Sequence, residues 1–332
     1  MPTALVLTGP GVFDLEERQA AETAPGEVLV SVLRVGLCGT DLHIVEGIHP
    51  RARFPLVLGH EIVGRIVGAA AVEGLVVVDP LIACGTCVAC RLGDRHVCAD
   101  LRLIGIDRDG GLGGIIAVDQ NRIHRVPAGV DLDIAGLAEP LAVAVHAVRR
   151  AGVVAGDRIA ILGAGPIGLL LAFVVRHLGA GAIFISEPSA ARRTFAASLG
   201  YEILDPSDPV ADLDARTDGS LADVAFDAAG VPAVAALLPR LVRPAGRIAI
   251  VAVYGRPVEL DLQAIVFREQ TVLGNRVYTP ADIDAALALL HDEGQALRPL
   301  IGEVVPLAEV VGAFARLRTG AALKVLVAMD AD

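Results

Sequence analysis

Short apolar runs separated by glycine fill the first part of the chain, to about residue 140. The clearest runs cover residues 28–35, 62–67 and 75–78. Runs of this length, rich in valine, isoleucine and leucine, are typical of strands. We therefore expect an irregular β-rich domain at the start of the chain.

The pattern changes in the middle of the chain, where predicted strands alternate with predicted helices. We expect strands at residues 158–162, 182–186, 223–227 and 247–251. We expect helices at 166–178, at 189–199 beginning on Ser189, and at 231–242. This alternation predicts an α/β domain with a doubly wound parallel sheet.

After about residue 275 the pattern predicts one more helix, at 280–291, and strands at 302–305 and 324–327. We expect this segment to return to the first domain. The first predicted domain therefore comprises residues 1–142 and 276–332. The predicted α/β domain comprises residues 143–275.

Composition supports a globular protein and argues against nucleic acid as a partner. Hydrophobic residues make up 54% of the 332 residues, charged residues make up 20%, and the net charge is −11. Nucleic-acid binding needs a basic face, which an acidic chain of this kind does not offer.

One stretch, residues 159–175, has no charged residue, but it contains Gly163, Gly165 and Pro166. It is also at the short limit for crossing a bilayer. A strand, a tight turn and a buried helix explain it better than a membrane span. We see no secretion signal before the first predicted strand, and we expect a soluble, cytoplasmic protein without a membrane partner.

The same stretch carries a dinucleotide-binding motif, G-x-G-x-x-G, at residues 163–168. It follows a predicted strand and opens a predicted helix, which is the context that this motif requires. Gly163 permits the tight turn, Gly165 lets the backbone approach a pyrophosphate, and Gly168 allows the helix to pack closely on the strand. The helix N-terminus then supplies free N–H groups for the phosphates.

Glu187 lies 19 residues beyond Gly168, at the end of the next predicted strand. A carboxylate there accepts hydrogen bonds from the ribose hydroxyls and repels a 2′-phosphate, so it favours NAD over NADP. Arg192 and Arg193 leave NADP open, because an arginine can hold that phosphate.

Four of the five cysteines form the pattern C-x2-C-x2-C-x7-C, namely Cys84, Cys87, Cys90 and Cys98. Four thiolates can enclose one zinc ion and leave no open position, which is typical of a structural site. An iron–sulfur cluster is the main alternative, but the ferredoxin spacing ends in C-x3-C-P, and Ala99 follows Cys98 here.

The fifth cysteine, Cys38, stands in the sequence GLCGTDLH, and the sequence GHE downstream contains His60 and Glu61. A thiolate, an imidazole and a carboxylate are suitable zinc ligands, and three protein ligands leave a position for substrate. Glu139, in AEPL, is a further acid that could join them. Each of these residues is unremarkable by itself.

Taken together, these motifs resemble the zinc-containing medium-chain dehydrogenase/reductase family over essentially the whole chain. The matching motifs are, in order, GLCGTDLH, LGHEIVG, CGTCVACRLGDRHVC, AEPLAVAVHA, LGAGPIGLL and LKVLV. The resemblance is strongest to the branch of sorbitol, butanediol and threonine dehydrogenases. It implies a GroES-like catalytic domain beside the Rossmann domain, two zinc ions per chain, and a homodimer or homotetramer.

The resemblance also implies roles for individual residues. Cys38 and His60 would be firm ligands of the catalytic zinc, Glu61 the usual third ligand, and water or Glu139 would complete the site. Thr40 would take the proton of the substrate hydroxyl, and His43 would pass it outward. The positions that match cofactor contacts are Pro166, Ile167, Glu187, Arg192, Val251, Val253 and Arg276, in addition to the three glycines of the motif.

The sequence therefore predicts an NAD-dependent zinc alcohol dehydrogenase that interconverts a secondary alcohol and a ketone. The positions expected near the metal include Ile44, Phe54, Leu112 and Val277, all apolar, which favours a butanediol-like diol over sorbitol. Polyol, cyclitol and L-threonine dehydrogenases remain alternatives. So do a zinc-free quinone or enoyl reductase of the same fold and a non-catalytic, zinc-stabilised binding protein.

Overall fold

The computed structural model describes residues 3–19, 21–68, 71 and 73–329. Its contacts divide the chain into two compact units. Unit 1 comprises Met1–Ala142 and Thr279–Asp332, and unit 2 comprises Val143–Tyr278. One boundary thus follows residue 142 and the other follows residue 278, whereas the sequence pattern places the second boundary after residue 275.

In the described residues, unit 1 contains three sheets. The largest has the strand order β10-β6-β5-β3-β18-β17, with β9 also paired to β3. Its strands are β3 (Glu27–Leu37), β5 (Glu61–Val67), β6 (Val76–Val78), β9 (Ile115–Asp119), β10 (Ile123–Arg125), β17 (Ile301–Pro306) and β18 (Lys324–Ala328). The two smaller sheets comprise β1 (Thr3–Gly9), β2 (Val12–Glu17) and β4 (Leu56–Val57), and β7 (Leu81–Ile82) and β8 (Arg102–Leu103).

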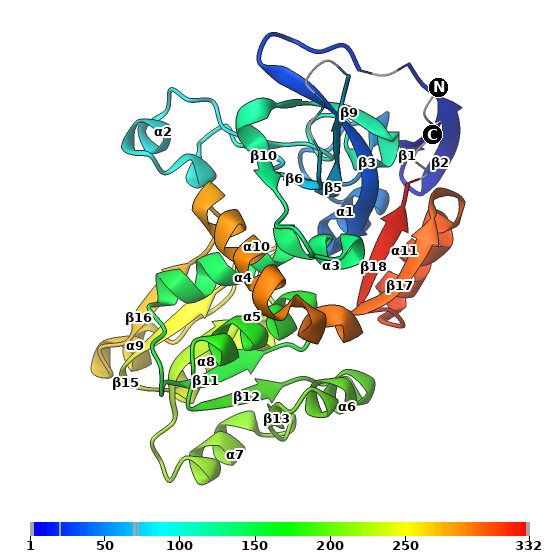
Figure 1. The fold of residues 1–332 in the computed structure, drawn as a ribbon. Helices are drawn as coiled ribbons and strands as arrows, with labels where there is room; N and C mark the ends of the chain where they lie inside the picture. The colour runs from blue at the N-terminus through cyan, green and yellow to red at the C-terminus, as the bar shows by residue number, and fades with distance from the viewer. Residues whose placement is uncertain (1–2, 20, 69–70, 72, 330–332) are drawn as a thin grey trace. The chain divides into compact units, whose positions relative to one another are not determined.

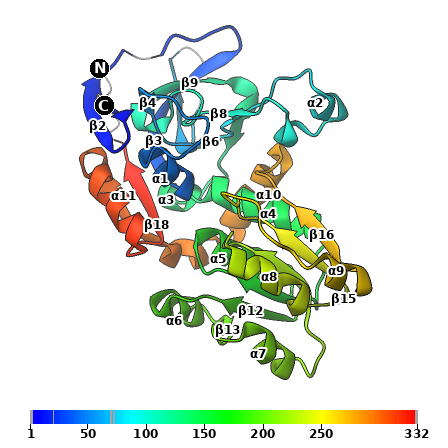
Figure 2. The ribbon, with the colours of Figure 1, turned by 180° about the vertical axis from the view of Figure 1, so that it is seen from behind.

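The C-terminal strands belong to unit 1 because β18 pairs antiparallel with β3, with Leu326 opposite Gly36. Figure 1 shows the red strand β18 in the same sheet as the blue strand β3. The helices of unit 1 are α1 (Gly39–Val45), α2 (Val88–Leu92), α3 (Leu132–Ala135), α10 (Pro280–Glu293) and α11 (Val310–Thr319). Figure 2 shows α2 on a loop that stands away from the sheets of unit 1.

Unit 2 is the doubly wound parallel domain that the sequence predicts, with the strand order β13-β12-β11-β14-β15-β16. Its strands are β11 (Arg158–Leu162), β12 (Ala182–Ser186), β13 (Glu202–Ile203), β14 (Ala222–Asp227), β15 (Val242–Ile250) and β16 (Thr271–Gly274). Its helices are α5 (Pro166–His177), α6 (Ala190–Ser198), α7 (Pro209–Arg216), α8 (Pro232–Leu241) and α9 (Leu262–Phe267). A further helix, α4 (Ala138–Ala151), begins in unit 1 and ends in unit 2.

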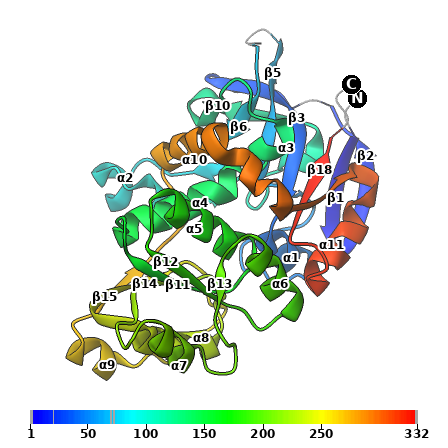
Figure 3. The same cartoon turned by 60° about the horizontal axis from the view of Figure 1, so that its bottom comes forward.

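The core of unit 2 lies around its central strands. Figure 3 shows α7, α8 and α9 on one side of the sheet and α5 on the other. Strands covered on both faces are mostly apolar. Every residue of β14 is buried, including Asp223 and Asp227 near its two ends. Strand order reverses between β11 and β14, so the ends of these two strands mark the position where ligands bind in folds of this class.

The uncharged stretch at residues 159–175 forms β11, a turn and most of α5. Within the described part of the chain, no helix is long and apolar enough to cross a membrane.

Candidate functional site

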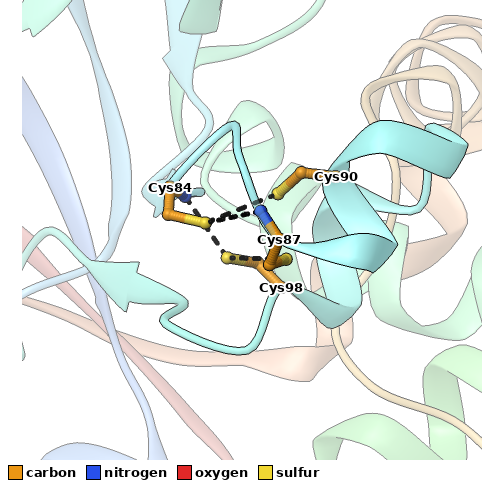
Figure 4. A group of neighbouring side chains, drawn as sticks. All are labelled: Cys84, Cys87, Cys90 and Cys98. Atoms are coloured by element: carbon orange, nitrogen blue, oxygen red, sulfur yellow. Dashed lines mark hydrogen bonds between the residues drawn. The ribbon is translucent and has the colours of Figure 1, made fainter.

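The four clustered cysteines lie in the loop between β7 and β8, around helix α2. Their sulfur atoms all lie within 4.8 Å of one another. The Sγ atoms of Cys84 and Cys90 are 4.0 Å apart, and those of Cys87 and Cys98 are 3.9 Å apart (Figure 4). A tetrahedral zinc ion with Zn–S bonds of about 2.3 Å needs sulfurs roughly 3.8 Å apart, and these two pairs are close to that spacing.

The loop also shifts the pKa values of these thiols, and for Cys84 it favours the thiolate that binds a metal. Backbone N–H groups of Thr86 and Cys87 lower the pKa of Cys84 to about 6. The N–H group of Cys87 lies 3.4 Å from the Cys84 sulfur. Cys90 differs, because burial raises its pKa to about 12. A bound cation removes that burial cost by neutralising the thiolate, so this site fits a metal ion better than four free thiols.

A second possible metal site is formed by Cys38, His60 and Glu61, whose ligand atoms also lie within 4.8 Å of one another. Cys38 follows β3 and caps helix α1, while His60 and Glu61 stand at the start of β5. β3 and β5 are antiparallel neighbours with Gly36 opposite Glu61. The sheet register therefore brings together residues that are more than twenty positions apart in the sequence.

Asp41 supports this second group, although the sequence analysis did not single it out. It is completely buried, and one of its carboxylate oxygens accepts a hydrogen bond from the Cys38 N–H at 2.9 Å. Its other oxygen lies 3.5 Å from Nδ1 of His60. Zinc-binding histidines usually hold a carboxylate on the nitrogen that does not bind the metal, so this arrangement leaves Nε2 for the ion.

The electrostatics at His60 favour positive charge. Burial alone lowers the pKa of His60, but Asp41 and Cys38 outweigh burial and raise this pKa well above its ordinary value. A position that favours a positive charge is one where a metal cation fits, and the three donor types match those of zinc.

Lys324 contacts this group, although the sequence analysis did not single it out. Its Nζ donates to the Leu37 carbonyl at 3.0 Å and forms an ion pair with the Glu61 carboxylate. Both charged side chains are almost fully buried. Burial lowers the pKa of Lys324, but the charges of Glu61 and Cys38 outweigh it and raise this pKa, so the ammonium stays charged. Glu61 is therefore held by a lysine on β18 as well as being available to a metal.

The other residues predicted for this site are Thr40, His43 and Glu139, and the first of them lies beside a ligand atom. The Thr40 hydroxyl lies 3.8 Å from the Cys38 sulfur, and His43 follows it on α1 with an exposed side chain. Glu139 is buried in the first turn of α4. It is not part of the group of three ligands, but its charge is among those that raise the pKa of Lys324.

The glycine motif of unit 2 forms the turn between β11 and α5. Gly163 has a φ of +108°, which side chains rarely allow. Gly165 is the N-cap of α5, and Pro166 and Ile167 form its first turn. A side chain at Gly168 would overlap the Gly163 carbonyl, so only glycine lets the helix begin this close to the turn. The free N–H groups of the helix start are those that a pyrophosphate needs.

Glu187 follows β12 and connects two loops. Its carboxylate accepts hydrogen bonds from the Ala164 N–H at 2.8 Å and the Ser189 N–H at 2.9 Å, and it is only 4% exposed. Arg192 lies in the first turn of α6. The Arg193 guanidinium donates to the carbonyls of Glu187 and Pro188, so it is already engaged in this structure.

The remaining cofactor candidates lie after the last two strands of unit 2. Val251 follows β15 and donates its N–H to the Asp227 carbonyl at 3.0 Å. Val253 is 92% exposed, and Arg276 is exposed two residues beyond the end of β16. Of the apolar positions that we expected around a substrate, Ile44 and Leu112 have no exposed surface at all. Neither of these two side chains therefore lines open space in this structure.

Comparison with known proteins finds zinc-binding dehydrogenases over most of the chain. Residues 24–128 match the alcohol dehydrogenase GroES-like domain, and residues 166–292 match the zinc-binding dehydrogenase domain. The chain is 39% identical to 2-dehydro-3-deoxy-L-galactonate 5-dehydrogenase of Pseudoalteromonas atlantica, over 92% of each chain.

Solved structures are similar over almost the full length. The 2R,3R-butanediol dehydrogenase of Bacillus subtilis is 29% identical, covers 99% of this chain with 100% of its own, and has a TM-score of 0.91. A zinc-binding dehydrogenase of Sinorhizobium meliloti bound to NADP is 31% identical, covers 98% of each chain, and has a TM-score of 0.91.

Proposed function

Because the chain belongs to the zinc-binding alcohol dehydrogenase family, as its matched domains and full-length relatives show, we propose that Cys38, His60 and Glu61 hold its catalytic zinc. The protein is an oxidoreductase that acts on CH–OH groups with a nicotinamide cofactor. The observation that carries the site assignment is the convergence of the three ligand atoms, with Asp41 behind His60. Cys84, Cys87, Cys90 and Cys98 would hold a second, structural zinc.

When bound, zinc makes a substrate hydroxyl more acidic, and the nicotinamide accepts the hydride. The chain's own residues then have to move one proton. Thr40, next to Cys38, would accept that proton from the substrate hydroxyl. His43 is exposed on the same helix and would pass it to solvent. Glu61 would be a ligand that Lys324 holds in place, and Glu139 would complete the shell or exchange with water.

For the substrate, we propose a secondary alcohol in a small compound that also carries a carboxylate. The relative that is 39% identical over 92% of the chain is named for such a sugar acid. A vicinal diol is the second candidate, because the butanediol dehydrogenase matches 99% of this chain at 29% identity. Two of the four apolar positions behind the diol expectation, Ile44 and Leu112, are fully buried, which weakens the case for an apolar pocket.

We further propose NAD as the cofactor, a homo-oligomer as the assembly and the cytoplasm as the location. Glu187 supports NAD, because its carboxylate occupies the end of β12. Five cysteines without a disulfide support a reducing compartment.

The metal assignment is tested by Cys38→Ala and His60→Ala. Both variants should keep their fold and lose turnover, because the structural lobe is separate from this site. Metal analysis should find two zinc ions in the wild type and one in each variant. Near-normal turnover in either variant would contradict the assignment.

The substrate class is tested by comparing kcat/KM under one set of conditions for L-galactonate, L-threonine, 2,3-butanediol and sorbitol. We expect a carboxylated compound to be the best substrate of the four. A higher value for 2,3-butanediol would favour the small diol, and a higher value for sorbitol would favour a polyol and contradict the carboxylated substrate.

A further inference from the structure

Asp227 is a completely buried carboxylate at the last position of β14. Within the described residues no cationic side chain pairs with it. Its hydrogen bonds come instead from the backbone N–H groups of Ala229 and Gly230, both at 2.9 Å, and from the Tyr254 hydroxyl at 2.5 Å. Burying a carboxylate without a cationic partner costs free energy, and these three hydrogen bonds offset part of that cost.

The Asp227 interactions join two loops. The N–H groups of residues 229 and 230 belong to the loop after β14, and Tyr254 belongs to the loop after β15. The Asp227 main-chain carbonyl also accepts hydrogen bonds from Val251 and Ala252, both at 3.0 Å. Asp227 therefore holds the loop after β15 at two places. Its main-chain carbonyl holds the start of the loop, and its carboxylate holds Tyr254 further along.

These loops lie against each other and against the glycine motif. A methyl group at Gly163 would lie 3.4 Å from Ala229, and one at Gly230 would lie 2.9 Å from the Cβ of Ala252. The turn after β11 and the loops after β14 and β15 are thus in van der Waals contact, side by side at the carboxyl edge of the sheet. All four of these positions are glycine or alanine, so the edge is tightly packed.

The position of Asp227 along this edge indicates which half of a dinucleotide it faces. Ligands of doubly wound sheets lie outside the carboxyl ends of the strands, across the point where strand order reverses. That point lies between β11 and β14, and Glu187, the ribose-binding candidate, stands on the β12 side of it. The loops after β14 and β15 therefore face the other half, which carries the nicotinamide.

We propose that Asp227 and Tyr254 are positioning residues for the nicotinamide half of the cofactor, with the Tyr254 hydroxyl tethering the loop after β15 to the buried Asp227 carboxylate. This inference rests on the proposed placement of the cofactor at the Gly163 turn.

The tether matters because most of the loop after β15 is exposed beyond Ala252. Val253, Gly255, Arg256 and Pro257 are all exposed. Burial and the neighbouring Asp227 charge raise the pKa of Tyr254 well above its ordinary value, so its hydroxyl keeps the proton that it donates. A loop that is already fixed does not have to be ordered when the ligand binds, and the affinity for that ligand is higher as a result.

The decisive variant is Tyr254→Phe, which removes only the hydroxyl. Isothermal titration calorimetry measures two dissociation constants, one for NADH and one for ADP-ribose, which lacks the nicotinamide. We expect the Kd for NADH to rise three- to tenfold and the Kd for ADP-ribose to stay within twofold of the wild type. Asp227→Asn keeps the shape and an acceptor oxygen, and it should have a smaller effect than Tyr254→Phe.

Two controls separate this inference from the proposed cofactor site. Tyr201→Phe makes the same chemical change elsewhere in unit 2 and should leave both constants unchanged. Glu187→Ala should weaken both ligands, because both contain the adenosine ribose. If Tyr254→Phe weakens both ligands equally, or neither, the positioning role is wrong. If Glu187→Ala changes neither, the cofactor placement itself is wrong.

Discussion

Lys324 is the single lysine in a chain that has 27 arginines. Its surroundings give a steric reason for this exception. A methyl group at Gly36 would overlap the Glu61 carboxylate and lie 3.0 Å from Nζ of Lys324, so the space beside the ion pair is already filled. A compact ammonium can donate to Glu61 and to the Leu37 carbonyl within this space, whereas a planar guanidinium needs more room. We conclude that size, as well as charge, determines the residue at this position.

We predict that, in protein without its catalytic zinc, Lys324→Met lowers the free energy of unfolding by about 3–5 kcal/mol, because it leaves the Glu61 carboxylate buried without a cation. The double variant Lys324→Met/Glu61→Gln should lose less than the sum of the two single variants. Urea unfolding of the four proteins, with their zinc contents measured, gives the coupling. Losses that add to within about 0.5 kcal/mol would show that the two residues do not interact.

At Glu187 the structure makes a second residue-scale prediction possible. Glu187→Gln keeps the size of the side chain and one acceptor for the Ala164 N–H, but it removes the charge that repels a 2′-phosphate. We expect the ratio of kcat/KM for NAD to that for NADP to fall by about tenfold, which corresponds to ~1.4 kcal/mol of lost discrimination. Arg193 is engaged with backbone carbonyls, so Arg192 is the residue expected to meet the phosphate. A wild type that already prefers NADP would contradict this account of Glu187.

At the scale of elements, local signals identified β11, α5, β12 and α6 to within one residue at each end. A buried strand, a glycine turn and a serine cap each act within a few residues, and Ser189 indeed accepts a hydrogen bond from the Arg192 N–H. The strand predicted at 247–251 actually begins at Val242. Its first part contains Pro244 and Gly246, which carry no strand signal of their own.

Elements that depend on distant contacts were harder to predict. The sequence analysis assigned no helix to α4, α7, α9 or α11 and no strand to β16. α9 and β16 have only six and four residues, so their own sequence signals are weak. Dependence on distant contacts also explains why the sequence analysis did not find every residue of the site. Cys38, His60 and Glu61 were found through their motifs, but Lys324 lies 263 residues from Glu61, and only the pairing of β18 with β3 brings them together.

The loop around α2 permits a prediction for one element. Cys90→Ala should open the four-thiolate site and remove its zinc, and loss of a structural metal is among the few single changes that cost more than about 4 kcal/mol. The Tm should therefore fall by roughly 10 °C. Cys38→Ala is the matched control, because it should lose a zinc ion and activity while keeping its Tm. Full zinc content and an unchanged Tm in Cys90→Ala would show that these cysteines hold no structural metal.

At the scale of the whole molecule, the two edges of the parallel sheet in unit 2 differ. β13 has only two residues, and one of them, Glu202, is charged and lies 3.6 Å from Arg216. β16 has four uncharged residues, and Val272 is 39% exposed. The helix before it, α9, exposes Leu262, Val266 and Phe267. Charged side chains and very short strands protect a sheet edge from pairing with another chain. β16 carries no charged side chain and is twice as long as β13.

We therefore predict that two copies of the chain associate through β16, whose edge can pair with itself about a two-fold axis. Val272→Lys should place a charge on each side of that contact and shift the protein to a smaller assembly in sedimentation-velocity measurements. Val304→Lys is the matched control, because Val304 is 40% exposed on β17, an edge strand of unit 1 that also carries the ion pair of Glu303 with Arg316. The control should keep the wild-type assembly, since that edge is already charged. If Val304→Lys dissociates the protein and Val272→Lys does not, the chain associates through the sheet of unit 1 instead.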